Sequence, residues 1–256
     1  MDGATGNACQ VQCRPLRRVG PQDILLVDLH IADAQAPACA AGGDPVVLAG
    51  ELPESAAETY TLLPVDVADG TTRVEVGYEW TDVEPSAAGD TRSVLDLGIW
   101  DADGTEGPEA FRGWSGSRQG LTGRGQDPVF ITAAAAERGY VPGPIEPGRW
   151  SVELGAGFIA PGGVSYEVTV TCDDADEGPP AERDPVDPEA VVRDEADWYA
   201  GDFHLHAYHS NPDGPAGQEM VEFARAAGLD FVPVTEYVTP THWWELGATQ
   251  RANPDV

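Results

Sequence analysis

The sequence contains no lysine, so all 14 basic residues are arginines, against 44 aspartates and glutamates. The formal net charge is -30. A chain this acidic repels phosphate backbones, which argues against nucleic-acid binding through a basic face. The lack of lysine fits either a GC-rich genome or a salt-rich environment, and the composition does not separate the two.

Long hydrophobic runs are also missing. No stretch reaches the roughly 18 apolar residues that a membrane-spanning helix needs, so we expect no membrane span. The longest apolar stretch near the start, residues 24–27, is too short for the core of a signal peptide. We therefore expect either a cytoplasmic protein or an extracellular one whose export signal is missing from this sequence.

Cysteine is scarce, with four in the chain: Cys9, Cys13, Cys39 and Cys172. An even number favours two disulfides in an exported protein, slightly ahead of free thiols. A zinc site at Cys9 and Cys13 would need a second close pair, and none follows. Cys172 ends the last predicted strand of the first domain and the other three lie near its start. One of those three should approach Cys172 if the protein is exported.

Hydrophobic residues make up 41% of the chain, enough to bury a substantial core. Short runs with polar and apolar residues in alternation are typical of half-buried strands, and clusters of Gly and Pro separate them. These runs are residues 24–27, 60–65, 73–80, 94–100, 129–131, 150–154 and 166–171. Many short strands without helical patterns between them predict an antiparallel β-sandwich over residues 20–173.

Four tryptophans lie in the predicted sandwich: Trp80, Trp100, Trp114 and Trp150. They can form a glycan-binding platform on its surface. Tryptophans in such positions are more often part of the core, which is the interpretation we favour.

Residues 174–196 differ in composition from what precedes them. The stretch is acidic and rich in proline, with little to bury. Pro185 and Pro188 keep it extended, and repulsion between like charges stiffens it. We predict a protease-sensitive linker, part of which can pack on a neighbouring element.

The pattern changes again in residues 197–256, which read as alternating strands and helices. Strands are predicted at 198–206 and 230–235, and helices at 215–227 and 239–251. Strand, helix and strand at this spacing predict a parallel βαβ unit.

Four of the five histidines lie between residues 204 and 242. Side chains at i and i+2 on a strand point the same way, so His204 and His206 can bind one metal ion together. Imidazole nitrogens suit zinc, iron and manganese. Asp202, just before the pair, can orient an imidazole without binding the metal itself.

Further ligands are expected from the segments that follow. His209 and Asp213 lie in the loop after the first predicted strand, and Glu236 ends the second. Carboxylates commonly complete a metal site that begins with imidazoles. The predicted metal ligands are therefore His204, His206, His209, Asp213 and Glu236.

Residues 201–206, Gly-Asp-Phe-His-Leu-His, with Ser210 and the pair Asp213-Gly214 after them, resemble the first motif of the PHP (polymerase and histidinol phosphatase) superfamily. Residues 226–235 resemble its second strand. Three sandwich segments are similar to the N-terminal domain of the CehA/McbA-like metallohydrolase branch: residues 111–116, 139–144 and 147–150.

The resemblance implies a distorted (β/α)7 barrel with two or three divalent metals. Members of the superfamily hydrolyse phosphate esters, and one branch cleaves a carbamate ester. We therefore expect a multidomain chain, in which a β-sandwich precedes the start of an α/β barrel.

The sequence departs from this family in two places. A metal-binding His of the family follows its second strand, whereas Tyr237 stands there in this chain, and His242 is an alternative donor. The family's later ligands would fall beyond Val256, and residues 197–256 supply two strands of a seven-stranded barrel. We therefore expect the chain to be the first part of a longer enzyme.

Two classes of function compete. The first is a metal-dependent hydrolase acting on small-molecule phosphate esters, with carboxylic or carbamic esters as the runner-up substrates. The second is a non-catalytic sandwich that binds a glycan or a protein beside a vestigial metal region. We expect the 256-residue chain itself to bind zinc or manganese weakly and to be inactive.

Overall fold

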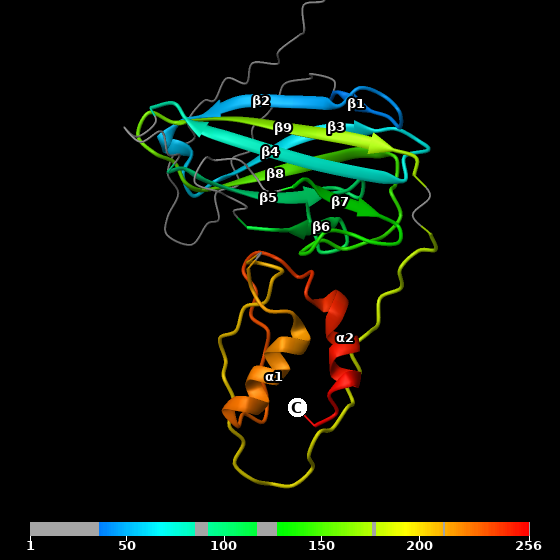
Figure 1. The fold of residues 1–256 in the computed structure, drawn as a ribbon, viewed down its shortest axis with the longest axis vertical. Helices are drawn as coiled ribbons and strands as arrows, with labels where there is room; N and C mark the ends of the chain where they lie inside the picture. The colour runs from blue at the N-terminus through cyan, green and yellow to red at the C-terminus, as the bar shows by residue number, and fades with distance from the viewer. Residues whose placement is uncertain (1–35, 85–91, 117–126, 176–177, 212, 256) are drawn as a thin grey trace, which may run out of the picture.

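The computed structural model describes residues 36–84, 92–116, 127–175, 178–211 and 213–255. Figure 1 shows a layered body of strands and, beyond it, a smaller part that carries two helices. The elements are β1 (Ala38–Cys39), β2 (Val46–Leu52), the 3-10 helix η1 (Glu54–Ala56), β3 (Tyr60–Val67), β4 (Arg73–Asp82), β5 (Val94–Trp100), β6 (Phe111–Trp114), β7 (Val129–Thr132), β8 (Gly148–Phe158), β9 (Val164–Asp173), α1 (Gly217–Ala227) and α2 (Trp243–Ala252).

The strands form two sheets, ordered β1-β3-β8-β5-β6 and β2-β9-β4-β7. The pairs are antiparallel except for β1 with β3. Both sheets contribute to one hydrophobic core, for example Leu97 and Val152 from one and Val74 and Val168 from the other. The sandwich half of the expected architecture is therefore present.

Alternation of side chains explains this packing. In β3 and in the first part of β4, every second residue is buried, as expected for strands with one face on the core. Trp80 and Trp150 are buried, and their indole N–H groups donate to the carbonyls of Ser93 and Glu146, each at 2.8 Å. Trp114 is also buried, while Trp100 is partly covered and donates to Glu153. The sandwich tryptophans thus serve mainly as core residues.

A disulfide between Cys39 and Cys172 joins β1 of one sheet to β9 of the other, with a Cα–Cα distance of 5.7 Å. One of the three early cysteines therefore does pair with Cys172. Cys9 and Cys13 lie outside the described residues.

The prediction that residues 197–256 begin a (β/α)7 barrel is wrong. The described part of residues 197–256 contains two short helices and no strand. The segments predicted as strands meet only in two isolated parallel bridges, Gly201 with Phe231 and Leu205 with Val234. Parallel strands are stable when helices cover both faces, yet Trp198 and Phe203 are 97% and 73% exposed. Without that cover the ladder does not extend.

The two predicted helices are present. Helix α1 ends at Ala227 and is capped by Gly228, whose φ of 70° lies in the left-handed region that favours glycine. Met220 and Ala224 are buried, whereas Phe223 is exposed. Trp243 begins α2 and is 54% exposed. No helix in the described ranges has the length and apolar character to cross a membrane.

The acidic linker runs beside α2 (Figure 1). The backbone of Asp187 exchanges two hydrogen bonds with the side chain of Gln250, at 2.8 and 3.0 Å. Arg251 donates to the carbonyl of Pro185. A Cβ at Gly247 would lie 2.0 Å from the carbonyl oxygen of Asp184, so this close approach requires glycine. Part of the linker is therefore packed on the C-terminal segment.

The C-terminal segment also contacts the sandwich directly. The guanidinium of Arg138, in the loop after β7, lies 4.3 Å from the ring centroid of Tyr208 and donates to the carbonyl of Gly214 at 3.1 Å. The hydroxyl of Thr241 donates to the carbonyl of Gly139 at 3.2 Å. These contacts place residues 206–214, the histidine loop, against the sandwich.

Candidate metal centre

His204 and His206 face each other across the end of the first bridged segment. Their Nε2 atoms lie 2.9 Å apart, and the two rings are inclined by 73°. At this distance one Nε2–H group donates to the other nitrogen. The segment is extended here, because Leu205 between them pairs with Val234. Two imidazoles thus direct the same ring atom toward one point.

This spacing is close to what a shared metal requires. Two nitrogens bound to one tetrahedral zinc ion at about 2.0–2.1 Å would lie about 3.3 Å apart. His206 Nδ1 is buried and has no hydrogen-bond partner among the described residues, although a Glu236 carboxylate oxygen lies 4.0 Å away. A proton on Nδ1 would leave Nε2 free to bind metal, and a carboxylate on that side favours this tautomer. The donor set therefore fits a transition-metal ion.

Glu236 lies behind His206, on the side of Nδ1. Its carboxylate accepts a hydrogen bond from the backbone N–H of Ala207 at 2.9 Å and another from the Ser210 hydroxyl. The side chain has no exposed surface, and burial raises the pKa of this carboxyl. Glu236 therefore ties the histidine loop together and faces His206 from behind.

Asp202 and Asp213 make only backbone contacts with their neighbours. The carboxylate of Asp202 accepts a hydrogen bond from the backbone N–H of His204 at 2.9 Å, which shapes the backbone just before the pair. Asp213 is exposed, and its own N–H donates to the side chain of Asn211. Among the described residues, neither carboxylate forms a hydrogen bond or ion pair with an imidazole of the pair, and Asp202 supports the backbone of His204 instead.

His209 is buried, 3% exposed, between the loop and the sandwich. Its Nδ1 atom is hydrogen-bonded to the Thr241 hydroxyl at 3.0 Å, and its Nε2 atom lies 3.8 Å from a carboxylate oxygen of Glu245. Burial, with smaller contributions from nearby His242 and Arg138, lowers the pKa of His209 to about 3. It is therefore a neutral side chain within the contact between the two parts of the molecule.

Tyr237 and His242, the two candidates for the metal-binding His that the resembling family has after its second strand, lie in different surroundings. The ring of Tyr237 stacks on His206, with centroids 4.0 Å apart, so the phenol covers a face of the imidazole. The ring of His242 packs near His209, at 6.3 Å between centroids, and burial lowers its pKa. Val238, next to Tyr237, has a φ of 45°, which is strained for a β-branched residue.

The described residues contain no group of three or more His, Cys, Asp or Glu side chains placed to hold one metal ion. Within the same ranges, the candidate ligands whose ring nitrogens converge on one point are His204 and His206. It also shows residues that the sequence did not single out, namely Arg138, Tyr208 and Thr241. Their partners lie up to about a hundred residues away in the chain, and no local pattern indicates them.

No model of a known protein family matches this chain, and no curated protein matches it either.

Proposed function

We propose that this protein is a metal-dependent hydrolase of phosphate esters, with His204 and His206 as two of its metal ligands. The observation that carries the proposal is the 2.9 Å separation of their Nε2 atoms. A divalent metal ion polarises the substrate oxygen and lowers the pKa of a bound water molecule to about 7, which makes that water a nucleophile at neutral pH. The resemblance of residues 201–206 to the first PHP motif supports the same chemistry, independently of any barrel.

The chain's own residues prepare this pair in four ways. Asp202 fixes the backbone at His204, and the bridge at Leu205 keeps the backbone extended so that both rings point the same way. Glu236 lies behind His206 and favours a proton on Nδ1. Tyr237 covers one face of the His206 ring and limits its rotation.

A second class of substrate, carboxylic or carbamic esters, has a specific observation in its favour. Phe203 and Tyr237, next to the pair, are both more than half exposed, and they offer apolar surface. No contact of an arginine with His204 or His206 occurs in the described parts of the chain. A neutral ester fits such surroundings without a guanidinium partner.

The first test is metal binding by the protein as it exists. Isothermal titration with zinc and with manganese should give a weak site, lost or weakened at least tenfold in His204→Ala and in His206→Ala. His30, which belongs to neither the pair nor its surroundings in the sequence, provides a matched control through His30→Ala. Binding that is unchanged in both single variants of the pair would contradict the proposed site.

The second test separates the substrate classes. Hydrolysis of p-nitrophenyl phosphate and of p-nitrophenyl acetate is measured with saturating metal, against a blank with metal alone. Turnover above the blank that disappears in His206→Ala supports the hydrolase, and the preferred substrate identifies the class. Metal-dependent turnover that survives His204→Ala would show that the site lies elsewhere.

A further inference from the structure

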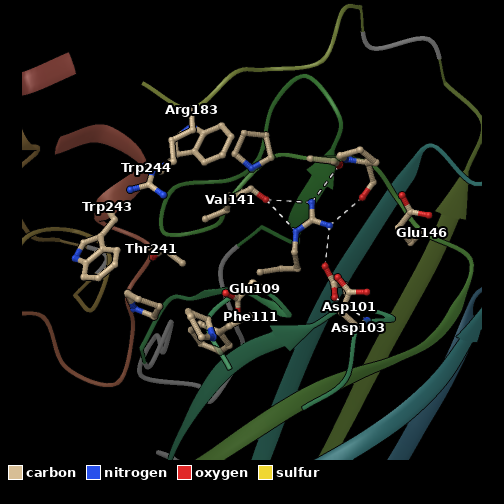
Figure 2. A pocket seen from close by; sticks show the side chains of 16 residues that line it. Asp101, Asp103, Glu109, Phe111, Val141, Glu146, Arg183, Thr241, Trp243 and Trp244 are labelled. Atoms are coloured by element: carbon tan, nitrogen blue, oxygen red, sulfur yellow. Dashed lines mark hydrogen bonds and ion pairs between the residues drawn. The ribbon is translucent and has the colours of Figure 1, made fainter. Parts of the chain in front are cut away.

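Two hollows adjoin the C-terminal segment, and their linings differ in charge. The larger, a cleft of about 470 Å³ against the sandwich rim, is lined by carboxylates and guanidinium groups as well as tryptophans. Figure 2 shows Trp243 at one end of this cleft and the carboxylates of Asp103 and Glu146 at the other. The smaller hollow, of about 340 Å³, is bordered by α1, α2, the linker and residues 231–234. Its lining has a single chemical character.

Apolar side chains from four segments line the smaller hollow, which we call the apolar hollow. Helix α1 contributes Met220 and Val221, and α2 contributes Leu246. Phe231 and Val234 belong to the second bridged segment, residues 231–234. Of the twelve described residues in the lining, eight are apolar and none is charged, although 23% of the chain is charged. A charged group would find no partner there, so the hollow favours an uncharged ligand.

Two of the polar side chains in the lining, Gln250 and Asn253, are already engaged. Gln250 exchanges hydrogen bonds with the backbone of Asp187, at 2.8 and 3.0 Å. The Asn253 amide donates to the side chain of Gln218 and to the carbonyl of Thr249, both at 2.8 Å. These bonds fix the linker and the end of α2 around the hollow. The affinity of a ligand would therefore come mainly from apolar contact.

The linker supplies the fourth wall through Val186 and Val192. These side chains are 38% and 45% exposed, in a stretch whose other residues are mostly acidic or proline. Val191, beside Val192, is 72% exposed and does not line the hollow. The linker thus turns Val192 toward the hollow and Val191 away from it. An apolar ligand would remove the exposed surface of Val186 and Val192 from water, which favours binding.

We propose that the apolar hollow binds the hydrocarbon chain of an uncharged molecule, for which a medium-chain alcohol is the simplest example. Apart from Phe231, the apolar side chains of the lining are aliphatic. Cavities lined by such side chains take up apolar molecules, and pockets of about 300–1,000 Å³ commonly hold small ligands. Since four segments share the hollow, the ligand would also hold the linker against the two helices. The site does not depend on the proposed hydrolase activity.

The test compares 1-hexanol, 1-octanol and the anion octanoate by isothermal titration of the 256-residue chain. Each added methylene group should tighten binding about fourfold, so 1-octanol should bind about fifteenfold more tightly than 1-hexanol. Octanoate should bind at least about tenfold more weakly than 1-octanol, because the lining offers its carboxylate no cation and the chain has a net charge of -30.

Val192→Asp should weaken 1-octanol binding at least about fivefold, because it removes apolar contact and places a charge in the lining. Val191→Asp is the matched control, since it adds the same charge one residue away and should leave binding unchanged. Both positions are exposed, so neither change should disturb the fold, which circular dichroism checks. Zinc binding should be the same in both variants, which separates this site from the histidine pair.

Three results would overturn the proposal: equal affinity for 1-hexanol and 1-octanol, octanoate binding as tightly as 1-octanol, or equal loss in Val191→Asp and Val192→Asp. Sedimentation measurements provide a fourth. A dimer that dissociates in Val192→Asp and persists in Val191→Asp would assign the apolar hollow to a second copy of the chain instead.

Discussion

The carboxylate of Glu236 lies 4.0 Å from Nδ1 of His206, on the side of the ring away from the nitrogen that faces His204. The same carboxylate holds the backbone N–H of Ala207 and the hydroxyl of Ser210. One buried side chain thus fixes the loop and influences which nitrogen of His206 carries the proton. The consequence for metal binding can be measured.

Glu236→Gln should weaken zinc binding about ten- to a hundredfold, because the amide loses the negative charge that favours a proton on Nδ1. An amide N–H facing Nδ1 would favour the opposite tautomer, in which Nε2 carries the proton and cannot bind metal. The measurement is titration with zinc, together with circular dichroism to check the fold. Glu222→Gln, on the exposed side of α1, should have no effect. Equal affinity in the wild-type and Glu236→Gln proteins would contradict this role.

Acid should loosen the contact around His209. The folded pKa of about 3 is below the ordinary value of 6.5, so the unfolded chain binds a proton that the folded chain does not. The stability contributed by neutral His209 is therefore complete above pH 6.5 and is lost as the pH falls toward 3. Between pH 6.5 and about pH 5 the loss should be about 2 kcal/mol.

His209→Gln keeps a hydrogen-bonding group for Thr241 and removes the titration. Urea unfolding at neutral pH and at about pH 5, followed by tryptophan fluorescence, should show a smaller acid-induced loss in this variant than in the wild type. Carboxylates titrate in both proteins, so the difference between the two isolates His209. Identical pH dependence would mean that His209 is not held neutral by burial.

The sequence predicted the strands and helices that depend on the alternation or spacing of neighbouring residues. The alternation in residues 73–80 predicted the half-buried strand β4, and the helix predicted at 215–227 is α1. The prediction of a barrel was wrong because parallel strands are stable only when helices cover both faces of the sheet. Residues 198–206 have the composition of a strand, but Phe203 and Trp198 remain uncovered and only two bridges form.

The candidate site shows the same limit. The spacing of His204 and His206 was enough to suggest a common point for their rings. The surroundings of Glu236 depend on contacts with Ala207 and Ser210, 29 and 26 residues away in the chain, which no spacing rule provides. The burial of His209 depends on the sandwich, through Thr241 and Gly139. Long-range docking is therefore what sequence patterns could not supply.

The disulfide between Cys39 and Cys172 should contribute strongly to the stability of the sandwich. It links residues 133 positions apart, and closing a loop of that length stabilises a folded chain by about 5 kcal/mol in the chain-entropy description. Cys39→Ser and Cys172→Ser should each lower the unfolding midpoint in urea by similar amounts, since either change removes the same bond. Reducing agent should affect the wild type and leave both variants unchanged.

Peptide mapping of the non-reduced protein by mass spectrometry checks the pairing directly. A peptide containing Cys39 joined to one containing Cys172 is expected. Recovery of Cys172 paired with Cys9 or Cys13 would contradict the structure.

Docking of the C-terminal segment on the sandwich should depend on Arg138. This side chain supplies two of the contacts that cross the junction, the one with the Tyr208 ring and the hydrogen bond to the Gly214 carbonyl. Together these contacts are worth about 1–2 kcal/mol at a partly exposed position. Arg138→Ala should therefore increase the undocked population about five- to thirtyfold. Cleavage in the linker tracks that population when opening is fast, so limited proteolysis between residues 174 and 196 should accelerate by the same factor.

Arg149→Ala is the matched control, because Arg149 pairs with Asp66 on the outer surface of the sandwich and takes no part in the junction. Arg138→Lys should fall between the two, since it keeps the charge but loses the planar group that stacks on the ring. If Arg138→Ala and Arg149→Ala are cleaved at the same rate, the junction is held by other contacts, and the hydrogen bond between Thr241 and Gly139 becomes the next one to remove.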